Sequence, residues 1–495
     1  MQIQDTNSEY LGVSRLQLME NAGMAVAQEV RRDSSFSELK SILVLCGTGG
    51  NGGDGLVAAR QLAHDKKVRI LVLGDIEQSR STPASHNWKT TKRLFLSFEI
   101  KIAKQSASIP VEWFKGNIGI IDAILGTGTK GELREPIKTA VQLSNKAAEN
   151  GVPVFAIDCP TGVDPQTGET KQEWIKASCT IALHRRKEGL APAVCGNIIT
   201  VDIGVPREAE FVVGPGDLLT IPSKDPEAHK GDSGKILVIG GSQEYTGAPA
   251  LVALAALRSG ADLAIIAAPN DVIDPIRAYS PELIVRGFEG SHLSASSISE
   301  LEELIAWADA VVVGPGLGIH SETEIAVQNL AKKLVSLEKV AIIDADALKF
   351  VSKEHVGNRT VLTPHAGEFL NLTGKRLPLG SKNLSERWKL VKEIAKEWNC
   401  TFLVKGKWDI IADPSRSKIN LTGCSEMTVG GTGDVLAGLT AGFCGMGCDP
   451  FYSANIGAFL NGLGGERALA SQCGVTPLEI IQNIPRVIQE LKARI

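Results

Sequence analysis

The stretch GGTGDVLAGL, residues 430–439, is a glycine-rich turn that runs directly into an apolar helix. Because Gly430, Gly431 and Gly433 lack Cβ atoms, successive backbone N–H groups can approach an anion there, and the positive end of the helix dipole points at the same place. Asp434 would satisfy free helix amides as an N-cap, or would take a proton beside a bound phosphate as a base. Capping alone does not explain the two preceding glycines. We therefore interpret Asp434 as a base and the turn as a phosphate site.

The chain has room for two α/β domains. Its 495 residues exceed the size at which one hydrophobic core usually stops growing. Short β-branched runs alternate with helical patterns in both halves, which is typical of parallel α/β sheets. The predicted strands are 41–46, 68–73, 118–125, 154–158, 180–183 and 198–203, then 235–239, 263–267, 310–313, 340–344, 361–363 and 402–405. The predicted helices are 14–31, 55–64 and 136–150, then 248–259, 321–337, 385–398 and 434–443, with Ser321 as an N-cap.

A boundary is predicted near the middle of the chain. Residues 213–232 are rich in Pro, Gly and charge and show no periodicity. The sequence therefore predicts domains at 1–212 and 233–495, joined by a linker over 213–232.

Composition excludes several classes of protein. The net charge is −4 and no strongly basic tract is present, which disfavours a nucleic-acid-binding surface. The nine cysteines are scattered without a CxxC pair, so free thiols in a reducing cytosol are expected rather than a zinc site. The N-terminal residues lack the pattern of a signal peptide, and no apolar run reaches a membrane-spanning length. We expect a cytoplasmic protein without nucleic-acid or membrane partners.

A second glycine-rich loop follows the first predicted strand. Gly47, Gly49 and Gly52 satisfy the pattern GxGxxG between a strand and a helix, which favours contact with a nucleotide pyrophosphate. The alternative is a tight turn in which Asp54 caps the helix. Asp75 could bind a ribose hydroxyl, as an acidic residue does in nicotinamide-dependent dehydrogenases. It lies further along the chain from the glycine motif than the usual ~20 residues, so a dehydrogenase fits less well.

Two more loops carry an aspartate at or near a strand end, where ligands bind in open α/β sheets. Asp122 begins one and could be either a hydrogen-bonded turn carboxylate or a ligand. Asp158 begins the other, beside Gly162, and a cleft carboxylate next to a glycine loop is well placed for proton transfer.

The first half resembles the NAD(P)H-hydrate epimerase family, which has a Rossmann-like three-layer sheet. The resemblance rests on the segments 51–55 (NGGDG), 18–23 (LMENAG) and 158–162 (DCPTG). It implies that Asp158 is the acid/base group and that Asn51, Asp122 and Thr161 coordinate K⁺. The residues that would hold the hydrated nicotinamide are Asn51, Gly52, Gly53, Asp54, Gly55, Gly126, Thr127, Gly128, Thr129, Lys130, Gly131, Glu132 and Asp158. His184 stands where this family pattern leads us to expect a small residue.

The 430–434 turn resembles the helix start of the ribokinase-like superfamily, whose members phosphorylate small alcohols. The loop 363–368 (TPHAGE) is similar to one that carries Asn near the magnesium–nucleotide site in that group, and here His365 takes its place. We expect His365 to contact substrate, although a structural role is the ordinary alternative. Lys405 follows a predicted strand and is expected to neutralise phosphate, with a solvated surface lysine as the alternative.

Further segments narrow the second half to a resemblance with ADP- or ATP-dependent NAD(P)H-hydrate dehydratases. They are 229–231, 240–249, 256–261 and 314–318. The resemblance implies substrate contacts from Ala248, Gly316, His365 and Asp434, and contacts to a Mg²⁺-bound ADP or ATP from Lys405, Gly430, Gly431, Thr432 and Gly433. Cys424 and Asn461 replace residues that are often Asn and His in this pattern, which puts nucleotide affinity in question.

An epimerase-like half fused to a dehydratase-like half resembles the family of bifunctional NAD(P)H-hydrate repair enzymes. That implies interconversion of R and S hydrates of NADH and NADPH, and ADP- or ATP-dependent dehydration of the S form through a phosphorylated intermediate. We also expect a homo-oligomer. The alternatives are a ribokinase-like kinase of a vitamin-precursor alcohol fused to a nucleotide-binding domain, and a nucleotide-sensing protein with degenerate sites.

Overall fold

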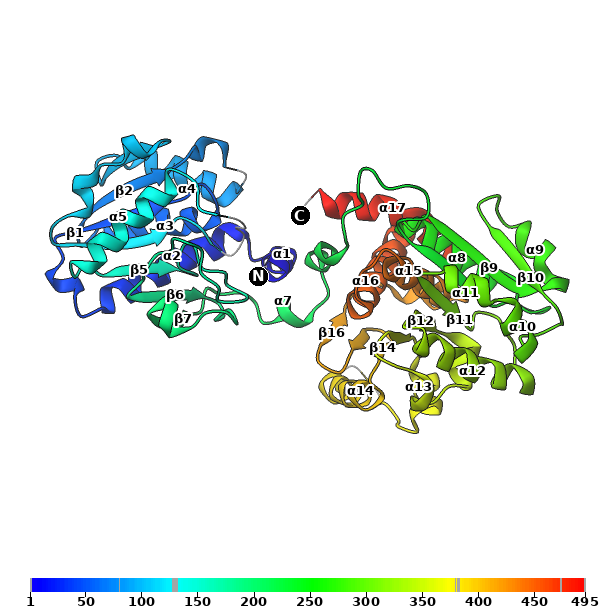
Figure 1. The fold of residues 1–495 in the computed structure, drawn as a ribbon. Coiled ribbons are helices and arrows are strands. Elements are labelled where there is room, and N and C mark those ends of the chain that lie inside the picture. The colour runs from blue at the N-terminus through cyan, green and yellow to red at the C-terminus, as the bar shows by residue number, and fades with distance from the viewer. Residues whose placement is uncertain are drawn as a thin grey trace. The chain divides into compact units, whose positions relative to one another are not determined.

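The computed structural model describes residues 2–79, 81–126, 132–378, 380, 383–471 and 474–493. The chain forms two compact α/β units (Figure 1). One unit is Leu11–Pro206, and the other combines the N-terminal helix α1 (Gln2–Tyr10) with the chain from Arg207 onward. Among the residues that the structure describes, no helix is long and apolar enough to cross a membrane.

The units divide elsewhere than at the expected boundaries of 212 and 233. Helix α1 packs against the 3₁₀ turn Pro215–Thr220, within the segment that the sequence predicts to be a linker. Asn7 of α1 donates to Asp217 Oδ2 at 3.1 Å and accepts from the N–H of Gly216 at 2.7 Å, and all three groups are buried. Hydrogen bonds between residues about 210 apart leave no periodic signal, so the sequence did not reveal them.

The Leu11–Pro206 unit contains a parallel sheet in the order β3-β2-β1-β4-β5-β6-β7. Its strands are β1 (Ser41–Cys46), β2 (Lys67–Leu73), β3 (Phe98–Ala103), β4 (Ile118–Ala123), β5 (Val154–Ile157), β6 (Cys179–Leu183) and β7 (Asn197–Val201). All six predicted strands are present, and only β3 was missed, because this edge strand exposes polar positions. The longer helices are α2 (Arg15–Arg32), α3 (Gly50–Leu62), α4 (Thr82–Arg93) and α5 (Ile137–Glu149). The strand order reverses between β1 and β4, so the crevice outside their carboxyl ends is the expected ligand position.

Glycines bring the loops at this crevice into close contact. A Cβ on Gly47 would lie 1.9 Å from Ile124 O, and one on Gly52 would lie 2.0 Å from Gly47 O. Helix α3 begins at Gly50, five residues before the predicted start, and its N-cap is Gly49. Asp54 therefore lies inside the helix, and its interpretation as a cap is wrong because the glycine run itself is helical.

The second unit has a mixed sheet in the order β10-β9-β8-β11-β12-β13-β14-β15-β16. Its strands are β8 (Lys235–Ile239), β9 (Leu263–Pro269), β10 (Ile284–Phe288), β11 (Ala310–Val313), β12 (Val340–Ile343), β13 (Thr360–Leu362), β14 (Thr401–Val404), β15 (Asp409–Ala412) and β16 (Ser417–Asn420). The strands β14, β15 and β16 pair antiparallel, and the other neighbours pair parallel. The sequence missed β10, β15 and β16, which are short and lie at or next to the sheet edges.

Long helices flank this sheet. They are α8 (Gly247–Ser259), α12 (Ser321–Ser336), α14 (Leu384–Trp398), α15 (Thr432–Gly445), α16 (Pro450–Ser471) and α17 (Pro477–Lys492), with the two-turn α13 (Ala366–Thr373) after β13. The predicted N-cap of α12 is wrong. His320 has the extended backbone of a cap and its Nδ1 accepts from the N–H of Glu322 at 3.2 Å, so Ser321 is already the first helical residue.

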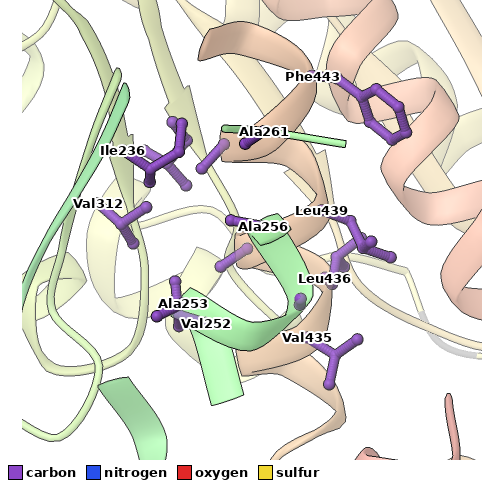
Figure 2. Close-up of a cluster of buried hydrophobic side chains, with 14 of the residues drawn as sticks. Ile236, Val252, Ala253, Ala256, Ala261, Val312, Val435, Leu436, Leu439 and Phe443 are labelled. Atoms are coloured by element: carbon purple, nitrogen blue, oxygen red, sulfur yellow. The ribbon is translucent and has the colours of Figure 1, made fainter. Parts of the chain in front are cut away.

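Helix α15 packs tightly on α8 in the core of the second unit (Figure 2). A Cβ on Gly438 would lie 2.3 Å from Val252 O, and one on Gly442 would lie 1.9 Å from Ser259 Oγ. These glycines let the two helix backbones approach closely, and Leu436 and Leu439 fill the surrounding core. This packing fixes the position of the turn before α15.

Candidate active sites

In the first unit, the three expected K⁺ ligands lie around one loop. Asp122 is the next-to-last residue of β4 and is fully buried. Its Oδ1 accepts a hydrogen bond from Thr161 Oγ1 at 2.7 Å, and its Oδ2 accepts one from Thr161 N at 2.8 Å. Thr161 Oγ1 accepts from Leu125 N at 3.1 Å, and Asn51 Nδ2 donates to Leu125 O at 3.1 Å. Asp122 also accepts from Ile124 N at 3.2 Å, so it is a turn carboxylate as well as part of this cluster. Burial raises the pKa of Asp122 to about 6, although bonds from Thr161 and Ile124 favour its charged form.

Asp158 lies at the end of β5 with 6% of its surface exposed. Its Oδ1 accepts from the N–H of Leu183 at 3.2 Å and pairs with the ammonium of Lys187. The sequence reasoning missed Lys187. Lys187 belongs to the run Arg185-Arg186-Lys187-Glu188, which has the composition of a solvated surface turn. The one available signal was its position shortly after the end of a predicted strand, just beyond His184.

The glycines expected to bind the hydrate do different things. The first amides of α3 point out of the helix start, so Asn51 and Gly52 can offer their N–H groups to a ligand. Gly53 instead donates its N–H to Gly49 O at 3.1 Å, and a Cβ on it would meet Met19. A Cβ on Gly55 would lie 2.4 Å from Ala123 Cβ, so Gly55 permits close packing.

The other predicted loop is described only at its ends. Gly126 lies against Asn51, with an ideal Cβ 3.4 Å from Asn51 Cβ. Gly126 and Glu132 line a cavity of about 210 Å³ together with Pro160 and Gly162. Thr127, Gly128, Thr129, Lys130 and Gly131 lie outside the described residues.

In the second unit, Asp434 is the third residue of α15. Gly431 is the N-cap, with a left-handed φ of 95°, and the side chain of Asp434 is therefore not the cap. The pKa of Asp434 is raised to about 7, first by burial and second by the neighbouring charge of Asp344, whereas Lys405 acts in the opposite direction. A carboxylate with this pKa is suited to accept a proton near neutral pH.

Asp344 and Lys405 form an ion pair next to Asp434. Asp344 follows β12 with 1% of its surface exposed, and its Oδ1 accepts from Lys405 Nζ at 2.9 Å and Thr363 Oγ1 at 2.7 Å. Lys405 Nζ also lies 4.0 Å from Glu368 Oε2. Burial lowers the pKa of Lys405, but the surrounding carboxylates outweigh it and leave that pKa raised. Lys405 is therefore not a solvated surface lysine.

Asp344 was missed by the sequence reasoning. It follows an apolar strand just as Asp158 does, so the same position after a strand could have revealed it. Its pairing with Lys405 could not be predicted, because Lys405 lies 61 residues further along the chain.

His365 has the structural role that the sequence reasoning held as its alternative. It is the N-cap of α13, and its Nδ1 accepts from the N–H groups of Gly367 at 3.0 Å and Glu368 at 3.3 Å. Glu368 Oε2 accepts from the N–H of His365 at 2.8 Å, which completes a capping box. The side chain of His365 is 60% exposed and also lines the cleft described next.

A cleft of about 1080 Å³ opens in front of the glycine turn. Its walls come from the turn, from the β14–β15 connection, from the loop after β16 and from helix α16. Of the five residues expected to contact the nucleotide, Gly430, Thr432, Gly433 and Lys405 line this cleft, and Gly431 is not among its lining residues. Cys424 and Asn461, the two departures from the family pattern, line it as well.

Ala248 and Gly316 lie beside each other, and neither of them lines that cleft. Gly316 has a φ of 68°, and an ideal Cβ on it would lie 3.5 Å from Ala248 Cβ and 2.7 Å from Tyr245 O. Gly316 follows β11, and Ala248 lies in the first turn of α8, which follows β8. Because β8 and β11 are neighbouring parallel strands, the two residues share one end of the sheet with Asp344 and Lys405.

Comparison with known proteins gives matches for both units. The family described as NAD(P)H-hydrate dehydratase matches residues 236–486, and the family described as YjeF-related protein N-terminus matches residues 15–189. A solved structure, the ADP/ATP-dependent NAD(P)H-hydrate dehydratase from Bacillus subtilis co-crystallised with ATP and Mg²⁺, is 28% identical with a TM-score of 0.48. It covers 57% of this chain and 99% of its own.

Two relatives align with nearly the whole chain. The bifunctional NAD(P)H-hydrate repair enzyme Nnr of Pyrobaculum aerophilum is 44% identical over 503 residues, which cover 99% of this chain and 97% of that protein. The enzyme of the same name from Methanothermobacter thermautotrophicus is 40% identical and covers 98% and 93%. At this identity and coverage, the chain belongs to the family of bifunctional NAD(P)H-hydrate repair enzymes.

Proposed function

We propose that this chain repairs hydrated NADH and NADPH at two active sites, one in each unit. The Leu11–Pro206 unit interconverts the R and S hydrates, and the second unit dehydrates the S hydrate with ADP or ATP. One observation carries this proposal in a chain of this family. Asp434, whose side chain does not cap helix α15, follows the glycine turn and lies beside the buried pair Asp344 and Lys405.

For dehydration, Asp434 takes the proton of the hydroxyl on the ring carbon beside the nitrogen. The oxygen forms a bond to the terminal phosphoryl group while the bond to the nucleotide breaks, which releases AMP from ADP or ADP from ATP. The amides of Gly431 and Gly433 stabilise the negative charge that develops. The carbon–oxygen bond then breaks, pushed by the ring nitrogen lone pair, and loss of a proton from the adjacent ring carbon restores the reduced nicotinamide.

The residues present fit a nucleotide-bound Mg²⁺. Among the described residues, no three His, Cys, Asp or Glu side chains form a metal-binding group, but Mg²⁺ in such sites is held by phosphates, water and one or two carboxylates. Asp344 and Glu368 are the carboxylates near Lys405 that would complete its shell. When bound, Mg²⁺ neutralises phosphate charge. Lys405 holds Asp344 in place and supplies a positive charge beside the transferred phosphoryl group.

For epimerisation, Asp158 exchanges a proton with the same hydroxyl. The proton moves to the carboxylate as the carbon–oxygen double bond forms and the carbon–nitrogen bond opens, and the electron pair of that bond stays on the nitrogen, conjugated through the ring double bond with the carboxamide. Rotation about the neighbouring bond presents the other face of the carbonyl carbon, and the reverse steps return the proton and close the ring. A single carboxylate can serve as acid and base in this sequence because the proton it accepts is the one it gives back.

A K⁺ ion fits the cluster around Leu125. Asn51, Asp122 and Thr161 all lie at the Leu125 loop and carry amide, carboxylate and hydroxyl groups, whose oxygens suit a hard cation. Asp122 is a fully buried carboxylate that makes no ion pair with any described residue, so a cation there would offset its burial.

One assay tests the function against its alternative. The protein is incubated with authentic NADH hydrate and ADP or ATP, and the absorbance of reduced nicotinamide and the released phosphate are followed. We expect both signals to rise together, with ADP and ATP compared as phosphoryl donors. Phosphorylation of a vitamin-precursor alcohol with neither signal would instead establish the kinase.

The residue that a dehydrogenase could use to bind a ribose hydroxyl has a different partner here. Asp75 pairs with Lys104 at 2.7 Å.

The cell compartment and the oligomeric state belong to the same proposal. The eight described cysteines are all free, which fits a reducing cytoplasm. The expected homo-oligomer stays a prediction that sedimentation of the purified chain would test.

A further inference from the structure

The two oxygens of Asp158 have different surroundings. Oδ1 accepts from the N–H of Leu183 at 3.2 Å and from the ammonium of Lys187. Among the described residues, none donates a hydrogen bond to Oδ2, and Oδ2 is not among the buried atoms that lack a partner. One oxygen is therefore held by the protein, and the other remains open to solvent or ligand.

The backbone at Asp158 is held in a rare conformation. Its φ is 65°, and the N–H of Cys159 donates to Ile157 O at 2.7 Å, which closes a three-residue γ-turn. The next strand, β6, ends in the same way: His184 has a φ of 63°, and the N–H of Arg185 donates to Leu183 O at 2.7 Å. Such conformations cost on the order of 1–3 kcal/mol each and persist where surrounding contacts enforce them, most often at functional sites.

Lys187 joins the two turns. Its Nζ contacts Asp158 Oδ1 and also donates to Leu183 O at 3.1 Å, so it bridges the ends of β5 and β6. The side chains of Lys187 and Asp158 are 15% and 9% exposed. A buried ion pair contributes little net stability, because desolvation offsets the attraction. Stability alone therefore does not explain why these two charges lie in the interior.

We propose that Lys187 is a positioning residue for epimerisation. Its ammonium holds Oδ1 of Asp158 and so leaves Oδ2 to exchange the proton with the substrate hydroxyl. Lys187 keeps its own protons throughout, since the proton that reaches Oδ2 is returned to the substrate when the ring closes. This inference rests on the proposed epimerisation and adds the residue that sets which oxygen reacts.

The test uses the full-length protein and the pure R hydrate of NADH without nucleotide, with formation of the S hydrate followed by chromatography. Lys187→Met should lower kcat at least about tenfold and leave KM within about threefold, because acid/base steps contribute roughly 10²–10⁴-fold and the substrate contacts remain. Lys187→Arg should recover part of kcat because it restores the cation. The matched control is Lys176→Met, which removes an exposed lysine of the same unit that pairs with Glu149 at 3.7 Å and should leave kcat unchanged.

A double variant keeps the test valid if Lys187→Met folds poorly. Asp158→Asn with Lys187→Met removes both charges, and it should have the same residual kcat as Asp158→Asn alone, because Lys187 acts through Asp158. A kcat of Lys187→Met equal to that of the wild type, or a double variant far slower than Asp158→Asn, would overturn the inference. If the wild-type chain does not interconvert the hydrates, the proposed function itself fails, which is a different result.

Discussion

Lys405 Nζ lies 2.9 Å from Asp344 Oδ1, so the cation next to the glycine turn is paired with a buried carboxylate. Asp434 lies beside this pair, and its pKa of about 7 follows from burial first, from Asp344 second and from Lys405 in the opposite direction. The protonation of Asp434, the base that we propose, thus depends on two residues from other segments.

Asp344→Asn should shift the pH dependence of dehydration. The base must be ionised to accept a proton, so in the wild type kcat/KM falls as the pH drops through about 7. Removing the charge of Asp344 lowers the pKa of Asp434, and the acidic limb should move to lower pH. A pH series with the S hydrate and ADP measures it, and epimerisation by the same preparation is the internal control. An unmoved limb would show that Asp344 does not act on Asp434.

Asp434→Asn should abolish dehydration and stabilise the second unit. The folded pKa is about 7, against roughly 3.9 for an unfolded Asp, so the folded state binds the proton more tightly. The stability that this proton contributes is therefore present below about pH 4 and lost as the pH rises through about 7. The neutral variant should gain about 1–2 kcal/mol above pH 7, after discounting for partial exposure, and nothing near pH 3. Urea unfolding at several pH values measures this, and a gain independent of pH would contradict it.

Asn7→Ala should destabilise the dehydratase unit although it lies at the start of the chain. The change removes the bond to Asp217 and leaves the N–H of Gly216 without its 2.7 Å partner, at a cost of about 2 kcal/mol. Heating with both activities followed should show earlier loss of dehydration and an unchanged loss of epimerisation. Equal loss of both would mean that α1 does not belong with the second unit.

Gly438→Ala should destabilise the protein by about 2–4 kcal/mol, since backbone atoms cannot move aside as flexible side chains do. The new Cβ would lie 2.3 Å from Val252 O on helix α8. The matched control is Gly430→Ala in the turn before the same helix, where nothing lies within 4 Å of the added Cβ. Thermal unfolding of both variants measures the difference, and similar melting temperatures would argue against the tight α8–α15 contact.

Epimerisation should depend on K⁺ through Asp122. Replacing K⁺ by tetramethylammonium should lower the rate, and Asp122→Asn should lower it in K⁺ and remove the response to the cation. Asp75→Asn is the matched control, because Asp75 is a carboxylate of the same unit that pairs with Lys104 away from the cluster. Rates of hydrate interconversion over a K⁺ titration measure this, and a cation response retained in Asp122→Asn would place the ion elsewhere.

Local sequence patterns were enough to predict the fold class and to identify the residues at the ends of strands. All twelve predicted strands are present, because β-branched runs buried on both faces are unmistakable, and the glycine turn before α15 is visible from the absence of side chains. Asp158 and Asp434 could be named for the same reason, since the residue just after a buried strand or at a helix start is known from the chain order alone.

The sequence by itself therefore determined two α/β units, the loops at the carboxyl ends of their strands, and the positions of Asp158 after a strand and Asp434 at a helix start. Only the tertiary structure decided that α1 belongs to the second unit, that Lys187 holds Asp158 and that Asp344 holds Lys405. The physical reason is the same in each case. These hydrogen bonds and ion pairs join residues 29 to 210 positions apart, and which distant segments meet in the fold leaves no local periodicity in the sequence.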